Sequence, residues 1–117
     1  MYKLVFFVPD SHLEQVKTAV FSSGAGRIGN YDQCCWQTTG QGQFRPLADA
    51  NPYIGQLHQL ETLSEYRVEM VCADEHILAA VAALRAAHPY EEPAFDVWRL
   101  AELALTRAAD QEGGKRE

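Results

Sequence analysis

The densest group of chemically capable side chains lies at residues 88–93, HPYEEP, which hold one imidazole, one phenol and two carboxylates. His88 with Glu91 or Glu92 has the donor atoms of a divalent-metal site, and the same groups suit a small molecule or a protein partner. Neighbouring side chains in a strand point to opposite sides, so at most one of the two glutamates shares a site with His88. The alternative is a structural turn between two prolines, with His88 favoured by the dipole of a preceding helix.

A second group of residues is the glycine-rich stretch 24–46, which contains five of the eight glycines and two of the three cysteines. Closely spaced glycines expose backbone N–H groups that could form an anion-binding nest at Gly26, with Arg27 as counter-charge and Asn30 as an additional donor. The alternative is a helix C-cap followed by a tight turn. The spacing G-x-G-x-x-G follows a helix-like segment here instead of a strand, which favours the turn.

Glu69 is unusual because it lies in the middle of a predicted strand, where a carboxylate must be paired, hydrated or bound to a ligand. Three arginines could pair with it, namely Arg27, Arg45 and Arg67. A structural ion pair is the favoured interpretation.

The adjacent Cys34 and Cys35 do not form a C-x-x-C motif, and their side chains face opposite ways in a strand. A nucleophilic thiol needs a neighbouring base, and nothing in the sequence brings a histidine to either cysteine. A catalytic cysteine is therefore not favoured.

Length and composition limit the function further. The 117 residues suffice for one domain, and no apolar run approaches the roughly 20 residues that cross a bilayer. The formal charge of −6 disfavours a nucleic-acid partner, and three cysteines suit a reducing compartment. We expect a soluble cytoplasmic protein without a membrane or nucleic-acid partner.

Hydrophobic periodicity predicts the order strand, helix, strand, strand, helix, strand. The predicted strands are 2–9, 31–39, 57–73 and 94–100, the helices start at 11 and 74, and 47–55 is a loop. Ser11 with Glu14 fits a capping box, and Asp74 fits an N-cap. The second strand is expected to run long and project beyond the sheet, with a bulge or bend at Gly40 and Gly42. Residues 1–100 form one domain, and 101–117 a short helical or disordered tail.

This order is that of an α+β, ferredoxin-like β-α-β-β-α-β sandwich, an antiparallel sheet with two helices on one face. The uncovered face then carries several large apolar side chains, which indicates a homo-oligomer. These are Val5, Phe7, Val71, Trp98 and Leu100.

The turns at 24–31 and 88–93 both follow helices, and we expect them at the same end of the sheet. They would form one rim, with Arg27 and His88 within about 15 Å, close enough to share a ligand. The mixture of charges on this rim suits a zwitterionic or metal-bridged ligand, or an internal His–Glu pair.

Four blocks of sequence in this order are long enough to be specific: GAGRIGNYDQCCWQTTGQGQFRP, ANPYIG, the strand 61–72 and AHPYEEPAFDVWRL. They closely resemble the domain that is inserted in many bacterial Nif-three-like (NGG-interacting-factor type) proteins and that also occurs alone. The resemblance covers about residues 2 to 100.

The resemblance implies a PII/CutA-like fold in stand-alone form, and trimers whose sheets pack around a central axis. Larger relatives are often labelled homologues of a type-2 GTP cyclohydrolase, with a dinuclear metal site in flanking domains. No metal ligand or cofactor is therefore carried over to this chain. The residues expected to bind a ligand, from chemistry and family motifs together, are Gly26, Arg27, Asn30, Tyr31, Glu69, His88, Tyr90, Glu91 and Glu92.

The sequence thus predicts a non-catalytic homotrimer that binds a small ligand or a partner protein between subunits. The alternatives are a divalent-metal-binding protein of CutA type and an enzyme, related to a type-2 GTP cyclohydrolase homologue or dependent on a thiol.

Overall fold

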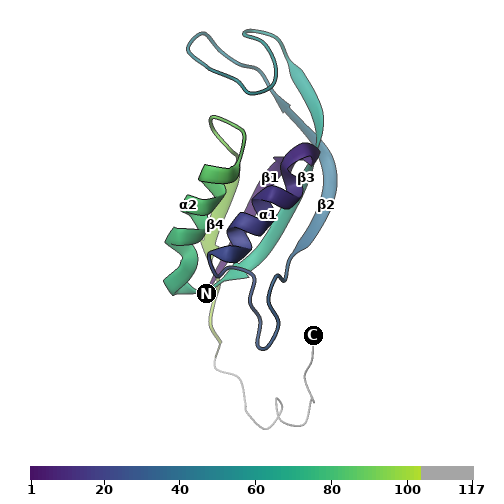
Figure 1. Ribbon diagram of the computed structural model, residues 1–117. Helices are drawn as coiled ribbons and strands as arrows, with labels where there is room; N and C mark the ends of the chain where they lie inside the picture. The colour runs from purple at the N-terminus through teal and green to yellow at the C-terminus, as the bar shows by residue number, and fades with distance from the viewer. Residues whose placement is uncertain (104–117) are drawn as a thin grey trace.

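The computed structural model describes residues 1–103 and has the predicted order of elements (Figure 1). Two short 3-10 turns, Asp10–His12 and Asp74–His76, precede the helices. The elements are β1 (Tyr2–Pro9), α1 (Leu13–Ser22), β2 (Trp36–Phe44), β3 (Glu61–Cys72), α2 (Ile77–Ala87) and β4 (Phe95–Arg99).

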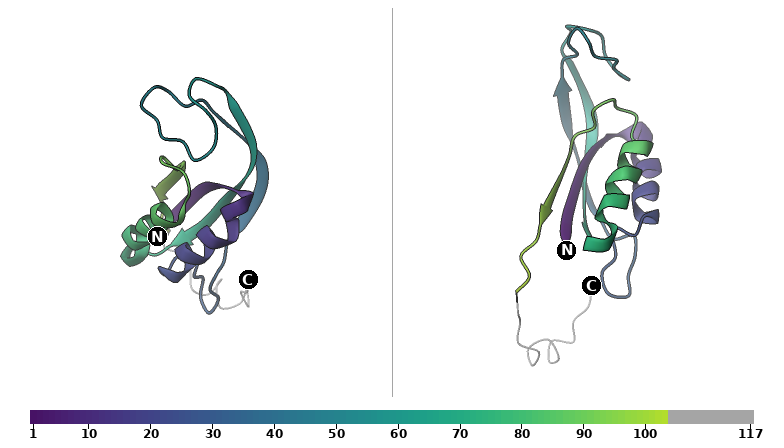
Figure 2. Two further views of the ribbon diagram at one scale, coloured as in Figure 1. Left: turned by 45° about the horizontal axis from the view of Figure 1, so that its top comes forward. Right: turned by 90° about the vertical axis from the view of Figure 1, so that its left-hand side faces the viewer.

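The four strands form one sheet in the order β2-β3-β1-β4, and every neighbouring pair is antiparallel. Both helices lie side by side on one face of this sheet, and the other face has no helix from the described residues (Figure 2). The structure therefore confirms the predicted α+β sandwich.

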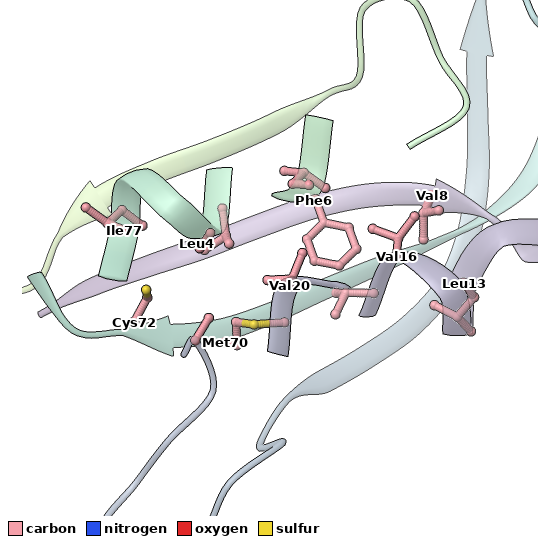
Figure 3. Close-up of a cluster of buried hydrophobic side chains, with 13 residues drawn as sticks. Leu4, Phe6, Val8, Leu13, Val16, Val20, Met70, Cys72 and Ile77 are labelled. Carbon is pink, nitrogen blue, oxygen red and sulfur yellow. The ribbon is translucent and has the colours of Figure 1, made fainter. Parts of the chain in front are cut away.

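Alternation along the two central strands builds the core between sheet and helices (Figure 3). Leu4, Phe6 and Val8 of β1 are all fully buried and face the helices, because successive side chains of a strand alternate between the two faces. The other members of this core are Leu13, Val16, Val20, Ala25, Val68, Met70, Cys72, Ile77, Ala80 and Leu84.

The opposite face of the sheet carries large apolar side chains beside charged ones and is partly open to solvent. Trp98 is 44% exposed and Trp36 61% exposed, whereas Val5 is buried between its neighbours Glu69 and Asp96 in the register. Four of the five expected apolar residues, Val5, Phe7, Val71 and Trp98, share this face through the register, whereas Leu100 lies beyond β4. Trp36, paired with Glu69, adds a second tryptophan to the face.

The β2–β3 hairpin projects beyond the sheet, as expected, because β1 ends where Pro9 pairs with Glu65 while β3 begins at Glu61 (Figure 1). Its pairing runs without interruption from Trp36 with Glu69 to Phe44 with Glu61. Of the predicted bulge or bend at Gly40 and Gly42, the bulge is therefore absent, and both glycines lie in regular strand pairing.

The start of β2 also differs from the prediction. It begins at Trp36 instead of residue 31, because Ile28 and Tyr31 bond to each other in a small separate loop.

The predicted helix caps are wrong as well. No side chain caps either helix of the described residues, and Ser11 Oγ lies 2.9 Å from His12 Nδ1 instead. Asp74 pairs with the N-terminal amine and with Arg99. A 3-10 turn starts each helix in place of a side-chain cap.

Within residues 1–103 no helix is long and apolar enough to span a membrane. Most of the predicted tail, 101–117, lies outside the described residues.

Candidate ligand-binding cavity

His88 closes the turn between α2 and β4. The residue is 6% exposed, and its backbone N–H donates to the Leu84 carbonyl as the helix ends. The ring Nε2 lies 2.7 Å from the Phe7 carbonyl oxygen, and Nδ1 accepts from the Tyr90 N–H at 3.1 Å. Since Nδ1 accepts, Nε2 carries the proton and donates. Burial lowers the pKa of His88, so the ring is neutral and both nitrogens have partners inside the chain.

Tyr90 stands at the centre of an aromatic cluster. Its ring centroid lies 4.8 Å from that of His88, 6.1 Å from that of Phe44 and 6.4 Å from that of Tyr53. Its hydroxyl is buried without a hydrogen-bond partner, the single such side-chain atom among residues 1–103. Burial, together with the nearby Glu65 carboxylate, raises the pKa of Tyr90 to about 12. The hydroxyl is therefore a neutral group that lacks a partner.

A cavity of about 440 Å³ lies against this cluster, between the projecting hairpin, the end of β1 and the turn before β4. Its walls are mainly apolar and aromatic, with three carboxylates and one guanidinium. The lining residues are Phe7, Gln43, Phe44, Arg45, Pro46, Leu47, Ala50, Pro52, Tyr53, Ile54, Glu65, Tyr90, Glu91, Glu92 and Ala94.

Two of the carboxylates have defined positions. Glu91 accepts the Asn51 N–H at 2.9 Å, which ties the loop of the hairpin to the turn before β4. Glu65 is half-buried and, in the described part of the chain, makes no hydrogen bond or ion pair. Burial raises its pKa. Its carboxylate lies against Gly42, where an added Cβ would approach Oε1 to 2.3 Å, so the absence of a side chain there makes room for it.

The glycine-rich turn lies at the opposite end of the sheet (Figure 1). Gly26 donates its N–H to the Val71 carbonyl at 2.8 Å and accepts from the Cys34 N–H at 2.8 Å. It has φ +82°, as predicted for a tight turn. Arg27 and Asn30 are exposed, and the Tyr31 N–H donates to Ile28. The Gly24 N–H also has a partner, the Phe21 carbonyl at 3.0 Å, so two of the glycine N–H groups expected to form an anion nest are already bonded.

The expected common rim of the two turns is wrong within the chain. The strands that precede α1 and α2 are antiparallel. The two helices therefore run in opposite directions and finish at opposite ends of the sheet, measured along the strands. His88 contacts Phe7, which pairs with Arg67, whereas Gly26 contacts Val71, four residues further along β3. This separation alone is about 13 Å of strand.

Glu69 lies on the uncovered face and is paired. Lys3 Nζ is 3.4 Å from one carboxylate oxygen and Arg67 Nε 3.3 Å from the other. The expected structural ion pair with an arginine is confirmed, and Lys3 is a partner that the sequence did not indicate.

Other chemically capable residues stay apart. Cys34 and Cys35 are half-buried free thiols in the loop before β2. Among residues 1–103 no three His, Cys, Asp or Glu side chains come together in an arrangement that could hold a metal ion.

The cavity thus contains three of the predicted ligand contacts, Tyr90, Glu91 and Glu92. The sequence reasoning missed Phe44, Tyr53 and Glu65. Two signals were available: the apolar and aromatic residues of the loop 47–55, which a solvated connection does not require, and the blocks QGQFRP and ANPYIG, which contain Phe44 and Tyr53.

Curated proteins with similar sequences share one name. The chain is 47% identical over 98 residues to a "GTP cyclohydrolase 1 type 2 homolog" of Mycobacterium leprae, and 44% identical over 101 residues to one of Halalkalibacterium halodurans. These alignments cover 84% and 86% of the chain. A solved structure of a Bacillus cereus protein related to NIF3 matches 86% of the chain with a TM-score of 0.74 and 38% identity. The chain is homologous to one domain of the Nif-three-like family.

The region of similarity is a small part of each relative: the chain spans about a quarter of their length, 26% and 27% for the two named. No family model matches the chain. The fold also occurs in CutA proteins: CutA from Nostoc aligns over 95% of this chain and 91% of its own, with a TM-score of 0.64 and 16% identity. The resemblance seen in the sequence is therefore confirmed for family and fold.

Proposed function

We propose that the chain is a cytoplasmic, non-catalytic domain that binds a small ligand in the cavity beside Tyr90 and assembles as a homotrimer. The observation that carries the binding proposal is the buried Tyr90 hydroxyl, which has no partner inside the described chain. A buried hydroxyl without a partner costs about 1 to 3 kcal/mol, and a shift of the Tyr90 ring toward a ligand in the adjacent cavity would supply the missing hydrogen bond.

The form of the cavity supports the same proposal. Small-molecule sites are typically concave, about 300 to 1,000 Å³ in volume, and apolar with a few polar groups that fix orientation. This cavity has about 440 Å³, four aromatic side chains and a small number of charged groups.

Binding can be tested with indole, a soluble neutral ring that fits an apolar cavity, followed by amide chemical shifts in NMR. We expect indole at up to about 10 mM to shift the amides of residues 44–54 and 90–94. Ala50→Trp should abolish these shifts by filling the cavity, whereas Ala79→Trp, at an exposed position of α2, should preserve them. Shifts that persist in Ala50→Trp would contradict the proposed site.

The trimer is proposed from the uncovered face of the sheet, where Trp36 and Trp98 are exposed. Exposed apolar surface of this kind is typical of a protein interface. We expect light scattering to give a mass near three times 13.1 kDa. Trp98→Glu should dissociate the assembly, because a buried unpaired charge costs several kcal/mol, while Leu78→Glu, 84% exposed on α2, should not. A monomer at micromolar concentration would refute the proposal.

The name of the curated relatives supports an alternative, an activity on GTP. Metal-replete protein that turned over GTP, and lost the turnover in Cys34→Ala, Cys35→Ala or His88→Ala, would replace the non-catalytic proposal.

A metal-binding alternative is supported by the fold of CutA from Archaeoglobus fulgidus, a solved protein described as a periplasmic divalent cation tolerance protein. Calorimetry with copper, zinc and manganese tests it, and dissociation constants above about 100 μM would exclude a physiological metal role.

A further inference from the structure

We propose that the ligand of the cavity is an organic cation, a protonated amine or quaternary ammonium group on an apolar or aromatic body. This inference rests on the proposed function and narrows it to one chemical class. It is carried by three observations: the arrangement of the rings, the excess of carboxylates, and the position of one unpaired carboxylate.

The aromatic rings that line the cavity do not stack on one another. The planes of Phe44 and Tyr90 are inclined by 53°, and those of Tyr53 and Tyr90 by 45°, so the three rings are not stacked on one another. The faces of Tyr and Phe rings attract cations within about 6 Å. Phe7, another lining residue, already interacts in this way, with Arg67 Cζ at 5.9 Å from its ring centroid.

The charged groups around the cavity are predominantly negative. Glu65, Glu91 and Glu92 face a single positive lining residue, Arg45. Arg45 is exposed and makes no ion pair within residues 1–103, so it offers an anion one weak contact at the rim. An anionic ligand would meet three carboxylates in a partly apolar space, where repulsion between like charges is less screened than in water.

Glu65 is the carboxylate best placed to select a cation. It lies within β3, on a rigid element, with its carboxylate held against Gly42 of the neighbouring strand. It is half-buried yet lacks a cation partner among the described residues, whereas Glu69 on the same strand has both Lys3 and Arg67. A bound ammonium group would give Glu65 the partner that Glu69 finds within the chain.

The test uses three probes that share an indole ring: tryptamine, which is a cation at pH 7, tryptophol, which is neutral, and indole-3-acetate, which is an anion. We expect tryptamine to bind at least about tenfold more tightly than tryptophol, and indole-3-acetate to bind most weakly. Dissociation constants come from NMR titration of the amides that line the cavity.

Two substitutions should remove the preference for tryptamine over tryptophol. Glu65→Gln keeps the shape and removes the charge. Gly42→Ala places a Cβ 2.3 Å from the present position of Glu65 Oε1, so the carboxylate must move away. The matched controls are Glu75→Gln, an exposed carboxylate at the other end of the sheet, and Gly40→Ala, which has no atom within 4 Å of the new Cβ. Both controls should retain the preference.

The outcomes test the cation selectivity separately from the small-molecule site on which it rests. Equal affinity for tryptamine and tryptophol would overturn the cation selectivity and leave the cavity as a small-molecule site. Tighter binding of indole-3-acetate would also overturn the cation selectivity. It would mean that Arg45, and not the carboxylates, selects the charge of the ligand. A preference that survives in both Glu65→Gln and Gly42→Ala would overturn the role of Glu65. If none of the probes, indole included, shifts the lining amides, the proposed function fails as well.

Discussion

The two turns that follow the helices differ in what their polar groups do. In the turn after α1, Gly26 uses both its N–H and its carbonyl to hold the turn against β3 and the loop before β2. In the turn after α2, His88 fixes the backbone, while Tyr90 and Glu91 face a cavity. One turn therefore uses its hydrogen bonds for structure, and the other leaves a hydroxyl without a partner. A residue suited to chemistry, such as His88, can thus serve to position a neighbour that is free to bind.

The largest expected effect is that of His88→Ala. The substitution removes a buried ring and leaves the Phe7 carbonyl and the Tyr90 N–H without these partners. We expect the free energy of unfolding, measured in urea, to fall by about 3 kcal/mol or more. Arg27→Ala, at an exposed position in the other turn, should change it by about 0.5 kcal/mol or less. Equal effects would remove the distinction between the turns.

Gly26→Ala tests the structural role of the first turn. A Cβ at this position, with φ +82°, would lie 2.7 Å from the Phe21 ring and 3.0 Å from the Cys34 carbonyl oxygen. We expect a loss of about 2 kcal/mol in urea unfolding. Gly29→Ala, with φ +56° and no atom within 4 Å of the new Cβ, should lose about 1 kcal/mol. Neither substitution should alter the binding of indole in the cavity. A change in that binding would contradict a purely structural role for the turn after α1.

Tyr90→Phe probes the second turn directly. It removes the hydroxyl that has no partner, so we expect the ligand-free protein to gain about 1 kcal/mol in unfolding free energy. Tyr53→Phe, whose hydroxyl belongs to an exposed residue, should be neutral. A clear loss of stability in Tyr90→Phe would mean that the hydroxyl has a partner in solution.

The smallest effect concerns pH. Burial lowers the pKa of His88 below its ordinary value of 6.5, so the unfolded chain binds a proton more readily than the folded one. The stabilisation is complete above pH 6.5 and is lost as the pH falls through the lower, folded pKa. Urea unfolding between about pH 8 and 5 should show this decline, and His88→Gln should reduce its slope. An unchanged slope would contradict a neutral, buried ring.

Most of the fold could be predicted from the sequence, for physical reasons that particular residues illustrate. Alternation of Leu4, Phe6 and Val8 identified the central strand, and Pro89 marked the end of the second helix. The order of elements followed from such local patterns. The helix caps did not, because Asp74 pairs with Arg99 and the N-terminal amine instead of bonding to the helix backbone.

The cavity could be predicted only in part. The HPYEEP turn was a candidate from its chemistry, but its partners in space come from the hairpin, through contacts such as that of Asn51 with Glu91. No local pattern encodes a contact between residues 40 positions apart. The prediction of a common rim was wrong for a different reason. The two central strands run in opposite directions, so the helices that follow them end at opposite ends of the sheet, and the prediction did not take this into account.

The sheet order also affects the order in which the molecule can fold during synthesis. β1 is made first, yet its partners come much later, since Tyr2 pairs with both Cys72 and Arg99. Until β4 leaves the ribosome, one edge of β1 has no strand beside it, and the turn that completes the cavity does not yet exist. The neighbouring β2 and β3 can pair as a hairpin well before that. Because distant pairings are slow to form, we expect nascent chains to gain the hairpin early and the finished sheet only after β4 has been synthesised.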